Sequence, residues 1–433
     1  MKTILYITLG CKVNQYETEA IRELLEKEGF SSAGENDAPD ILILNSCTVT
    51  AESDRKARKT IRHYKKLYPD IITLLLGCMP SAFPEKAKAT GADIIFGNTD
   101  HSAIPALIKE FLTKGERIIK IEPHEIGEEY KTPSICSFSE RTRAYMKIED
   151  GCNRFCSYCA IPYARGRVRS RSIESIEKEA KALAENGYKE IVLVGINLSA
   201  FGQSTDKNLC DAVEAVAKAE GIKRVRLGSL EPDHITDEML LRLKSVAEFC
   251  PQFHLSLQSG SNRTLKRMNR HYTAEFYKDL TDRIKAIFPT SSITTDIMVG
   301  FQGETEEEFL ESLEFMKSVG FARCHIFAYS EREGTAALKL QGRVLNAEKQ
   351  RRASIMINLA AQTQKAFMEN MLGTEDSLLL ESFENGFSEG YTPNYTRVRI
   401  KGGEELLGEI VPVRLEKIQD DIIEGKIIGA DEK

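Results

Sequence analysis

The sequence predicts an α/β protein in three parts: an N-terminal doubly wound parallel-sheet domain, a central partial (open) α/β barrel, and a small C-terminal all-β domain. Two series in which short apolar runs alternate with amphipathic runs predict the first two parts, because strands that alternate with helices pair in parallel. Short apolar runs without helical period predict the third part. At 433 residues, the chain is also longer than one hydrophobic core usually covers.

The N-terminal domain is predicted over residues 1–120. Its strand-like runs are TILYITLG, ILILNS, IITLLLG and ADIIFGN, and helix-like segments such as Tyr16 to Phe30 and the basic Ala51 to Tyr68 separate them. Residues 121–143 (IEPHEIGEEYKTPSICSFSERTR) interrupt the alternation with Pro, Ser and charged residues. We therefore predict a linker there.

The central domain is predicted over residues 144–370. Six strand-like runs follow one another there: AYMKIED, EIVLVGIN, RVRLGSLEP, FHLSLQSGS, ITTDIMVGF and CHIFAYS. Six strand–helix units exceed half of a closed eight-stranded barrel, so an open barrel is expected. Residues 371–433 contain LLLES, TRVRI, LLGEIVPVRL and IIEGKIIG, which predict the small all-β domain.

Composition indicates the compartment of the protein and the state of its cysteines. No run of 18 or more uncharged apolar residues is present, so no membrane is expected as a partner. The apolar run at the start is shorter than the core of a secretion signal, and we expect a cytoplasmic protein. Ten cysteines, unevenly placed beside strand-like runs, favour reduced metal ligands over a disulfide framework.

The net charge of −6 is a weak argument against nucleic-acid binding, because phosphate contacts usually leave a basic footprint. From Met371 onward the chain holds 14 acidic and 7 basic side chains. Subtracting this −7 from the total leaves the first 370 residues at +1. The acidic C-terminal part thus masks a nearly neutral body with local basic stretches.

Three cysteines after the first strand of the central domain carry the strongest motif. Cys152, Cys156 and Cys159 lie in a C-x3-C-x2-C spacing within GCNRFCSYC. An iron-sulfur cubane takes one cysteine per iron, so three ligands leave one iron open to a small molecule. A zinc site would require a fourth Cys or His close by, and the sequence offers none there.

This spacing resembles the signature of radical S-adenosylmethionine (SAM) enzymes, in which the open iron binds SAM and an electron cleaves it to a 5'-deoxyadenosyl radical. The resemblance implies a partial barrel with the cluster loop after its first strand. Polar residues that follow other predicted strands suggest, as a set, a SAM pocket at the carboxyl ends of the strands. Capping of helices is the competing reading for each of them. These residues are Asn197, Ser229, Glu231, Gln258 and Asp296.

A second group of cysteines is spread over the N-terminal domain. Cys11, Cys47 and Cys78 each come directly after one of the first three strand-like runs. Ligands gather outside the carboxyl ends of parallel strands, so these thiols can meet at one sheet edge. Buried cysteines acting as small hydrophobes would explain one such placement but poorly explain three. We predict a second 4Fe-4S cluster here. Four cysteines match no ligand spacing and are interpreted as structural: Cys136, Cys210, Cys250 and Cys324.

From end to end the chain resembles the radical SAM methylthiotransferase family. The motifs that carry the resemblance are LGCKVNQYE, NSCTVT, LGCMP, DGCNRFCSYCAIPYARGRVRSR, SLEP, LSLQSGS, TDIMVGFQGETEEEF and GYTPNYTRVRI. The last motif resembles the TRAM domain, which holds RNA or protein substrates. LGCKVNQYE together with CNRFCSYC is most similar to the branch that acts on threonylcarbamoyladenosine beside the tRNA anticodon.

The resemblance implies a reaction and its cofactors. The radical made at the cluster of Cys152, Cys156 and Cys159 removes hydrogen from carbon 2 of the adenine, the cluster of Cys11, Cys47 and Cys78 delivers sulfur, and a second SAM supplies the methyl group. It also implies a tRNA substrate, an electron donor and a sulfur source, the last two of unknown identity. Which tRNAs are modified is not encoded in any motif.

RNA contacts are predicted in two segments. Arg165, Arg167, Arg169 and Arg171 alternate along RGRVRSR, and an extended chain would send all four side chains to one face, where they could contact phosphates. A solvated strand edge would give the same pattern. In the TRAM-like segment, aromatic stacking and arginine contacts are expected from Tyr395, Arg397 and Arg399.

Three other functions fit parts of the sequence. The same chemistry could act on isopentenyladenosine in tRNA, or on an aspartate of a ribosomal protein. The acidic C-terminal part is compatible with a protein substrate. From another class, the chain could be a non-catalytic iron-sulfur protein that binds RNA and senses iron or redox state. That reading predicts no SAM cleavage.

Overall fold

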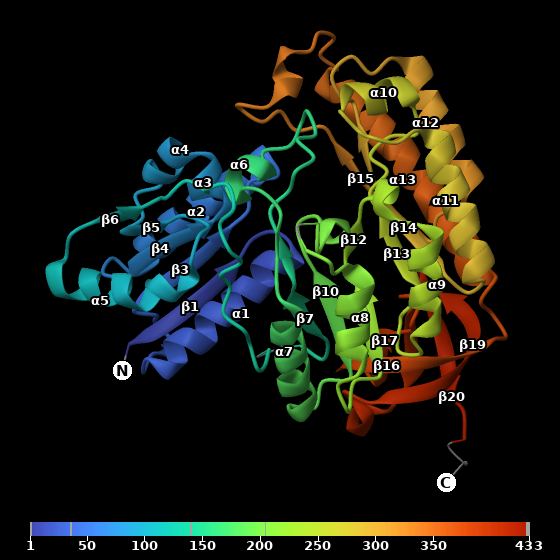
Figure 1. Cartoon of the computed structure of the whole chain (residues 1–433), viewed down its shortest axis with the longest axis horizontal. Coiled ribbons are helices and arrows are strands. Elements are labelled where there is room, and N and C mark those ends of the chain that lie inside the picture. The colour runs from blue at the N-terminus through green and yellow to red at the C-terminus, as the bar shows by residue number, and fades with distance from the viewer. Residues whose placement is uncertain (1, 35–36, 139–140, 204, 430–433) are drawn as a thin grey trace.

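The computed structural model describes residues 2–34, 37–138, 141–203 and 205–429 of the chain. Figure 1 shows the three predicted parts in order, with the N-terminal domain beside the central barrel and the C-terminal barrel beneath it. The α/β fold class with its small all-β domain is confirmed. Among the described residues, no helix combines the length and the apolar character that a membrane span requires.

The N-terminal domain is built on a six-stranded parallel sheet in the order β2-β1-β3-β4-β5-β6. The strands are β1 (Thr3–Thr8), β2 (Ser31–Ser32), β3 (Ile41–Ser46), β4 (Ile72–Gly77), β5 (Ile94–Phe96) and β6 (Ile118–Lys120). β3 is buried along its whole length because helices cover both faces of the sheet. The chain passes to opposite sides of β1 to form β2 and β3, so the sheet order reverses there.

Helices of this domain lie on both faces of the sheet. They are α1 (Lys12–Lys27), α2 (Ala51–Leu67), α3 (Cys78–Ala82), α4 (Pro84–Lys88) and α5 (Ile104–Lys114). Apolar positions of α1 and α5 pack with one face, through Ile21 and Ile108 among others. Ala57 and Ile61 of α2 pack with the other face. The spacing of these residues by three and four positions is what fixes the buried side of each helix.

The central domain is a partial barrel of parallel strands in two hydrogen-bonded sets, β11-β10-β7 and β12-β13-β14-β15. The strands are β7 (Ala144–Lys147), β10 (Glu190–Val194), β11 (Arg224–Leu227), β12 (Ser229–Leu230), β13 (Gln252–Leu255), β14 (Ser292–Val299) and β15 (Arg323–Ala328). β11 and β12 are two parts of one run separated by Gly228. β7 and β15 are the free edges, so the barrel is open.

Helices surround this barrel, and the first of them lies between the two strands of a short antiparallel pair. The helices are α6 (Ile161–Arg165), α7 (Ile173–Glu185), α8 (Leu209–Ala217), α9 (Asp237–Ser245), α10 (Asn262–Arg267), α11 (Ala274–Ile287), α12 (Glu306–Val319) and α13 (Asn346–Glu369). β8 (Glu149–Asp150) pairs antiparallel with β9 (Arg169–Ser170). The described residues between Lys120 and Ala144 form no helix or strand.

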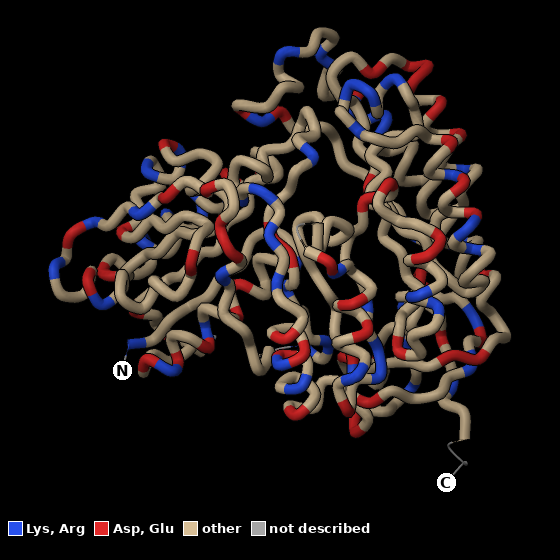
Figure 2. Tube along the Cα trace, viewed as in Figure 1, with Lys and Arg blue, Asp and Glu red and all other residues tan. Residues whose placement is uncertain are grey.

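The C-terminal domain is a closed barrel in the order β16-β17-β18-β20-β19. Its strands are β16 (Glu375–Glu384), β17 (Phe387–Tyr391), β18 (Arg397–Lys401), β19 (Ile410–Gln419) and β20 (Ile422–Ile427). Arg224 and Arg226 of β11 donate to the carbonyl oxygens of Tyr391 and Pro393, at 2.8 and 2.7 Å. These bonds fix the β17–β18 loop against the central barrel. Figure 2 shows acidic and basic residues interspersed along all three parts.

Candidate active site

The three cysteines of the N-terminal domain lie at the carboxyl edge of its sheet. Cys11 is the N-cap of α1 directly after β1, Cys47 follows β3, and Cys78 is the first residue of α3 after β4. β1, β3 and β4 are adjacent strands, and the sheet order reverses at β1 and β3. In open α/β sheets, ligands bind at this reversal. Burial raises the pKa of Cys47 and of Cys78, and the charge of Cys11 raises both further.

Two glycines allow the backbone to bring these cysteines together. Gly10 has φ +117°, and a Cβ there would lie 2.8 Å from the Cβ of Cys47. Gly77 has φ +95°, and a Cβ there would lie 2.4 Å from Oδ1 of Asn45. Any other residue would meet both an unfavourable backbone conformation and a collision. Each LGC motif therefore needs its glycine for geometry.

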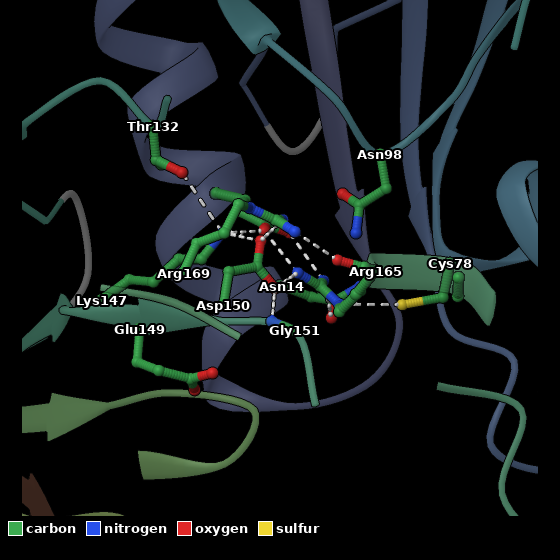
Figure 3. Close-up of polar contacts among 12 residues, drawn as sticks. Asn14, Cys78, Asn98, Thr132, Lys147, Glu149, Asp150, Gly151, Arg165 and Arg169 are labelled. Atoms are coloured by element: carbon green, nitrogen blue, oxygen red, sulfur yellow. Dashed lines mark hydrogen bonds and ion pairs between the residues drawn. The ribbon is translucent and has the colours of Figure 1, made fainter. Parts of the chain in front are cut away.

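A buried polar network connects this sheet edge to the central domain (Figure 3). Nε of Arg165 donates to Sγ of Cys78 at 3.3 Å, and its Nη1 donates to Glu17 at 2.8 Å and to Asp150 at 3.1 Å. The Nζ atom of Lys147 lies 2.7 Å from both carboxylates. Burial raises the pKa of Glu17, but Arg165 and Lys147 outweigh it and hold that pKa at about 2. Two cations and two carboxylates thus stay charged in the interior.

The second triad lies on the loop between β8 and α6, at the carboxyl end of the first barrel strand. Gly151 has φ +84°, and Phe155, which is not glycine, has φ +48°. Residue 155 in this conformation turns the loop between Cys152 and Cys156. Burial is the main reason that the pKa of Cys159 is raised, and the charges of Cys156 and Cys152 raise it further.

Five of the six cysteines of the two triads accept hydrogen bonds from N–H groups. Backbone N–H groups of Val49, Arg154 and Ile161 donate to Cys47, Cys152 and Cys159, at 3.4 to 3.5 Å. Guanidinium groups of Arg165 and Arg270 donate to Cys78 and Cys156, at 3.3 and 3.2 Å. Cys11 instead donates to Asn14, and Cys210 donates to the carbonyl of Met239. Donors aimed at sulfur are the environment that stabilises a thiolate or a cluster sulfur.

Three cysteines in each triad are a ligand set that suits an iron-sulfur cluster. Among the described parts of the chain, no three His, Cys, Asp or Glu side chains converge enough to hold one ion. Cubane cysteines bind separate irons and need no such convergence. Burial raises the pKa of Cys78 and of Cys152 to about 12, so without a bound metal these thiols stay neutral. Metal coordination removes these protons.

A cavity of about 360 Å³ lies between the two domains beside the second triad. Cys159, Gln258, Asp296 and Tyr329 line it from the barrel, and Val49 and Thr50 line it from the loop after Cys47. Gln258 has φ +69°, and its buried Oε1 has no hydrogen-bond partner among the described residues. A buried acceptor left open in this way fits a ligand that brings its own donors.

The other predicted pocket residues lie around the same strand ends. Asn197 is buried, with Oδ1 unpaired among the described residues, and its backbone N–H donates to Glu149 at 2.7 Å. Ser229 lines a different cavity, described below. Glu231 accepts from Arg270 at 2.6 Å, and the same guanidinium contacts Cys156. Glu231 therefore supports the cysteine loop through Arg270.

The second cavity, of about 470 Å³, lies at the open side of the barrel. Gly10, Cys11 and Lys12 line it from the N-terminal domain, and Tyr395 lines it from the C-terminal barrel. Asp296 lines both cavities. The two triads thus open onto neighbouring spaces that share one carboxylate.

Comparison with known proteins identifies the family. Residues 146–316 match the radical SAM superfamily, and residues 3–97 match the uncharacterized protein family UPF0004. The chain is 37% identical to threonylcarbamoyladenosine tRNA methylthiotransferase MtaB of Bacillus subtilis, over 99% of this chain and 97% of that protein. The chain belongs to the radical SAM methylthiotransferase family. The resemblance seen in the sequence is thereby confirmed.

Other relatives of this methylthiotransferase are named for two different substrates. The protein named MtaB of Thermotoga maritima is 35% identical over 99% of both chains. The tRNA-2-methylthio-N(6)-dimethylallyladenosine synthase of Natranaerobius thermophilus is 33% identical over 94% of this chain and 93% of that protein. The radical SAM family implies one 4Fe-4S cluster and SAM.

Solved structures share the fold of this methylthiotransferase. The radical SAM methyltransferase TsrM of Kitasatospora setae has a TM-score of 0.56 at 14% identity, covering 76% of this chain and 72% of that one. The cobalamin-dependent radical enzyme OxsB has a TM-score of 0.50 at 15% identity, over 84% and 56%.

The four alternating arginines do not share a face, so that expectation for the methylthiotransferase was wrong. Arg165 ends α6 and is fully buried, and Arg171 is buried with an ion pair to Glu179 at 2.7 Å. Arg169 pairs with Glu128 at 2.8 Å. Only Arg169–Ser170 is extended as β9, because the preceding residues turn through α6. Arg165 and Arg171 are unavailable to phosphates, whereas Arg167 is exposed and stacks on Phe155 at 4.5 Å.

The three predicted RNA-contact residues of the C-terminal barrel differ in their surroundings. Tyr395 stacks on Tyr391 with ring centroids 4.5 Å apart and lines the second cavity. Arg397 is exposed and pairs with Glu389. Arg399 is mostly covered and donates to Glu424 at 2.6 Å. Of these three residues, Tyr395 is the one that lines the second cavity.

Some residues of the site were not predicted from the sequence. Arg270 donates to Cys156, and Glu149 accepts from the backbone N–H of Asn197. The second cavity is lined by Lys12 and His254. Lys12 could have been found, since it follows a cysteine that ends a strand. Nothing in the pattern around Arg270 indicates that it reaches back 114 residues to Cys156.

Proposed function

We propose that this radical SAM enzyme adds a methylthio group to carbon 2 of the adenine in threonylcarbamoyladenosine, next to the anticodon of tRNA. The observation that carries the proposal is full-length similarity to enzymes named for this substrate, at 35 to 37% identity over 95% or more of the chain. The neighbouring cavities at the two cysteine triads agree with chemistry that needs both.

Cys152, Cys156 and Cys159 would hold the SAM-binding cluster, and Cys11, Cys47 and Cys78 a second 4Fe-4S cluster. When bound, the first would supply reductive cleavage of SAM, and the second would supply sulfur. The placement of Cys11, Cys47 and Cys78 at adjacent strand ends supports the second cluster. The N–H donors aimed at Cys47 and Cys78 support it further.

The protein's own residues would bind SAM, orient the cysteine loop and enclose the site. Asn197 and Gln258 offer open buried acceptors to SAM, and Arg270 orients the cysteine loop while neutralising Glu231. Tyr158 and Tyr329 pack around Phe301 beside the first cavity, with apolar surface that excludes water. A dry site protects a reactive radical from side reactions.

The tRNA would bind across the central and C-terminal barrels, with Arg167, Arg397 and Tyr395 as contacts. An electron donor and a sulfur source of still unknown identity are required by the chemistry. Reduced cysteine ligands and a tRNA substrate both favour the cytoplasm as the compartment.

A second candidate substrate is dimethylallyl-modified (isopentenyl) adenosine in tRNA. Relatives named for that substrate are 33% identical over 94 to 95% of the chain, only slightly less than those named for threonylcarbamoyladenosine. The reaction at carbon 2 would be the same, and the group on N6 would differ.

The test is an anaerobic assay of reconstituted enzyme with reductant, SAM and tRNA carrying either modification. Mass spectrometry would follow 5'-deoxyadenosine and the methylthio nucleoside. We expect product only from threonylcarbamoyladenosine, and its loss in Cys47→Ala while SAM cleavage persists. Cys136→Ala is the matched control, because Cys136 is exposed and outside both triads. Absence of SAM cleavage in the wild-type enzyme would refute the proposal, and product only from the dimethylallyl substrate would change the substrate.

A further inference from the structure

The second cavity carries an excess of positive charge. Three cations line it: Lys12 at the start of α1, Arg141 before β7, and Arg323 at the start of β15. Asp296 is the one carboxylate among its described lining residues. Oδ2 of Asp296 lies 3.4 Å from Nε2 of His254, so this carboxylate already faces a partner that can be positive.

Lys12 and Arg323 stand out among the cations near the site. Neither makes a hydrogen bond or an ion pair with any residue that the structure describes, whereas Arg141 donates to the Tyr145 hydroxyl at 3.1 Å. The Nζ atom of Lys12 lies 5.9 Å from the centre of the Tyr145 ring. Elsewhere in the interior, cations such as Lys147 are matched by carboxylates at 2.7 Å.

The two side chains line the same cavity from different domains. Lys12 and Arg323 both lower the pKa of His325 through their charge, after burial, which is the larger cause. His325 itself lines the cavity on β15. Two unmatched cations that line one cavity favour an anionic ligand, because a neutral one would leave both unpaired and the half-buried Lys12 partly desolvated.

Resting on the proposed function, we propose that Lys12 and Arg323 bind the carboxylate of the threonylcarbamoyl group and so select this substrate over dimethylallyladenosine. Cys11 lines the same cavity, so a base that receives sulfur there would bring its N6 substituent with it. The threonylcarbamoyl group ends in a carboxylate, whereas the dimethylallyl group is an uncharged hydrocarbon. A site built for a charged group rejects an analogue that lacks it far better than an apolar pocket rejects a similar shape.

Two other anions are less suited to this position. The carboxylate of SAM belongs with the open iron on Cys152, Cys156 and Cys159, and the cavity beside Cys159 is a separate one. A backbone phosphate could reach Arg323, which is exposed, whereas Lys12 is half-buried beside Cys11. The substituent on the base is the anion that must enter with the reacting atom.

The test compares three anticodon stem-loop RNAs, which carry threonylcarbamoyladenosine, its methyl ester, or dimethylallyladenosine. Dissociation constants would be measured by fluorescence anisotropy on the reconstituted protein without reductant, and kcat/KM with it. The variants are Arg323→Gln and Lys12→Gln, with Lys181→Gln on the exposed face of α7 as control. Iron and sulfide content would be measured for Lys12→Gln because Cys11 is its neighbour. Arg323 lies on β15, away from all six cluster cysteines in sequence.

We expect wild-type protein and Lys181→Gln to bind the acid at least about tenfold more tightly than the ester, and Arg323→Gln to bind both alike. Equal loss for acid and ester in Arg323→Gln would overturn the inference and indicate a phosphate contact. An unchanged preference for the acid would also overturn it. Methylthiolation of only the dimethylallyl RNA by wild-type enzyme would instead refute the proposed function, whatever Arg323→Gln does.

Discussion

Nε of Arg165 lies 3.3 Å from Sγ of Cys78, so a cation from the segment that follows one cysteine triad touches a thiol of the other. Arg165 comes six residues after Cys159, and its other contacts are Glu17 and Asp150. The two triads are therefore held in fixed relation by one side chain that is fully buried.

Replacing Arg165 should destabilise the protein and loosen iron binding. Arg165→Gln leaves Glu17 with Lys147 and leaves Asp150 with Lys147 and Arg169, and breaking a buried ion pair costs about 3–5 kcal/mol. We expect a lower free energy of unfolding by that order, and less iron bound in a variant that lacks Cys152, Cys156 and Cys159. Arg167→Gln is the control, because Arg167 is exposed two residues away. Equal stability of the two variants would contradict this account.

Gly10→Ala should damage the N-terminal triad more than an alanine at another left-handed glycine. Gly10 and Gly29 have φ of +117° and +86°, but a Cβ at Gly29 meets nothing within 4 Å, while one at Gly10 meets Cys47. Backbone strain alone costs about 1–3 kcal/mol and applies to both. Chemical denaturation and iron content measure the difference. If Gly29→Ala proves equally harmful, the contact with Cys47 does not matter.

The stability of the cluster-free protein should fall as pH rises from about 5 to 8. Burial raises the pKa of Glu149 from its usual range to about 8, so in this interval the folded state holds a proton that the unfolded state has lost. The stabilisation present below pH 4.5 is then lost progressively, by up to about 5 kcal/mol. Urea unfolding at several pH values would show a flatter profile for Glu149→Gln. Identical slopes in the two proteins would exclude Glu149 as the cause.

Tyr395 should contribute to RNA binding through its ring. It lines the second cavity and is held by Tyr391 and by the guanidinium of Arg226, 4.8 Å from its ring centre. Stacking on a base is worth about 1–3 kcal/mol, so Tyr395→Ala should weaken binding of the stem-loop roughly tenfold, while Tyr395→Phe keeps most of the affinity. Anisotropy titrations would measure this, and a large loss in Tyr395→Phe would point to the hydroxyl instead.

The sequence was sufficient for the architecture and for the placement of three cysteines at one sheet edge. The β3 run ILILNS and the six barrel runs form strands because their apolar character matches sheets covered on both faces. Cys11, Cys47 and Cys78 could be grouped because strands in a parallel sheet end at the same edge. Periodicity, and the position of a cysteine just after a strand, are local properties of the chain.

The arginines of RGRVRSR could not be placed in this way. Their alternation predicts a shared face only if the backbone is extended, and Pro162 instead starts the short helix that ends at Arg165. Whether an arginine is buried depends on partners far away in sequence, such as Glu17, 148 residues earlier. The same holds for Lys12 and Arg323, whose relation arises only from the docking of two domains.

The hydrogen bonds from Arg224 and Arg226 to the β17–β18 loop tie the C-terminal barrel to the central barrel. The C-terminal barrel therefore cannot be exchanged by itself. A chimera that replaced residues 371–433 with the barrel of another enzyme would keep a strand surface for RNA. It would lose the loop shape that presents Tyr395 to the cavity, because that shape depends on the carbonyls of Tyr391 and Pro393 meeting two arginines of β11. Engineering by domain exchange therefore requires β11 and this loop to be transplanted together.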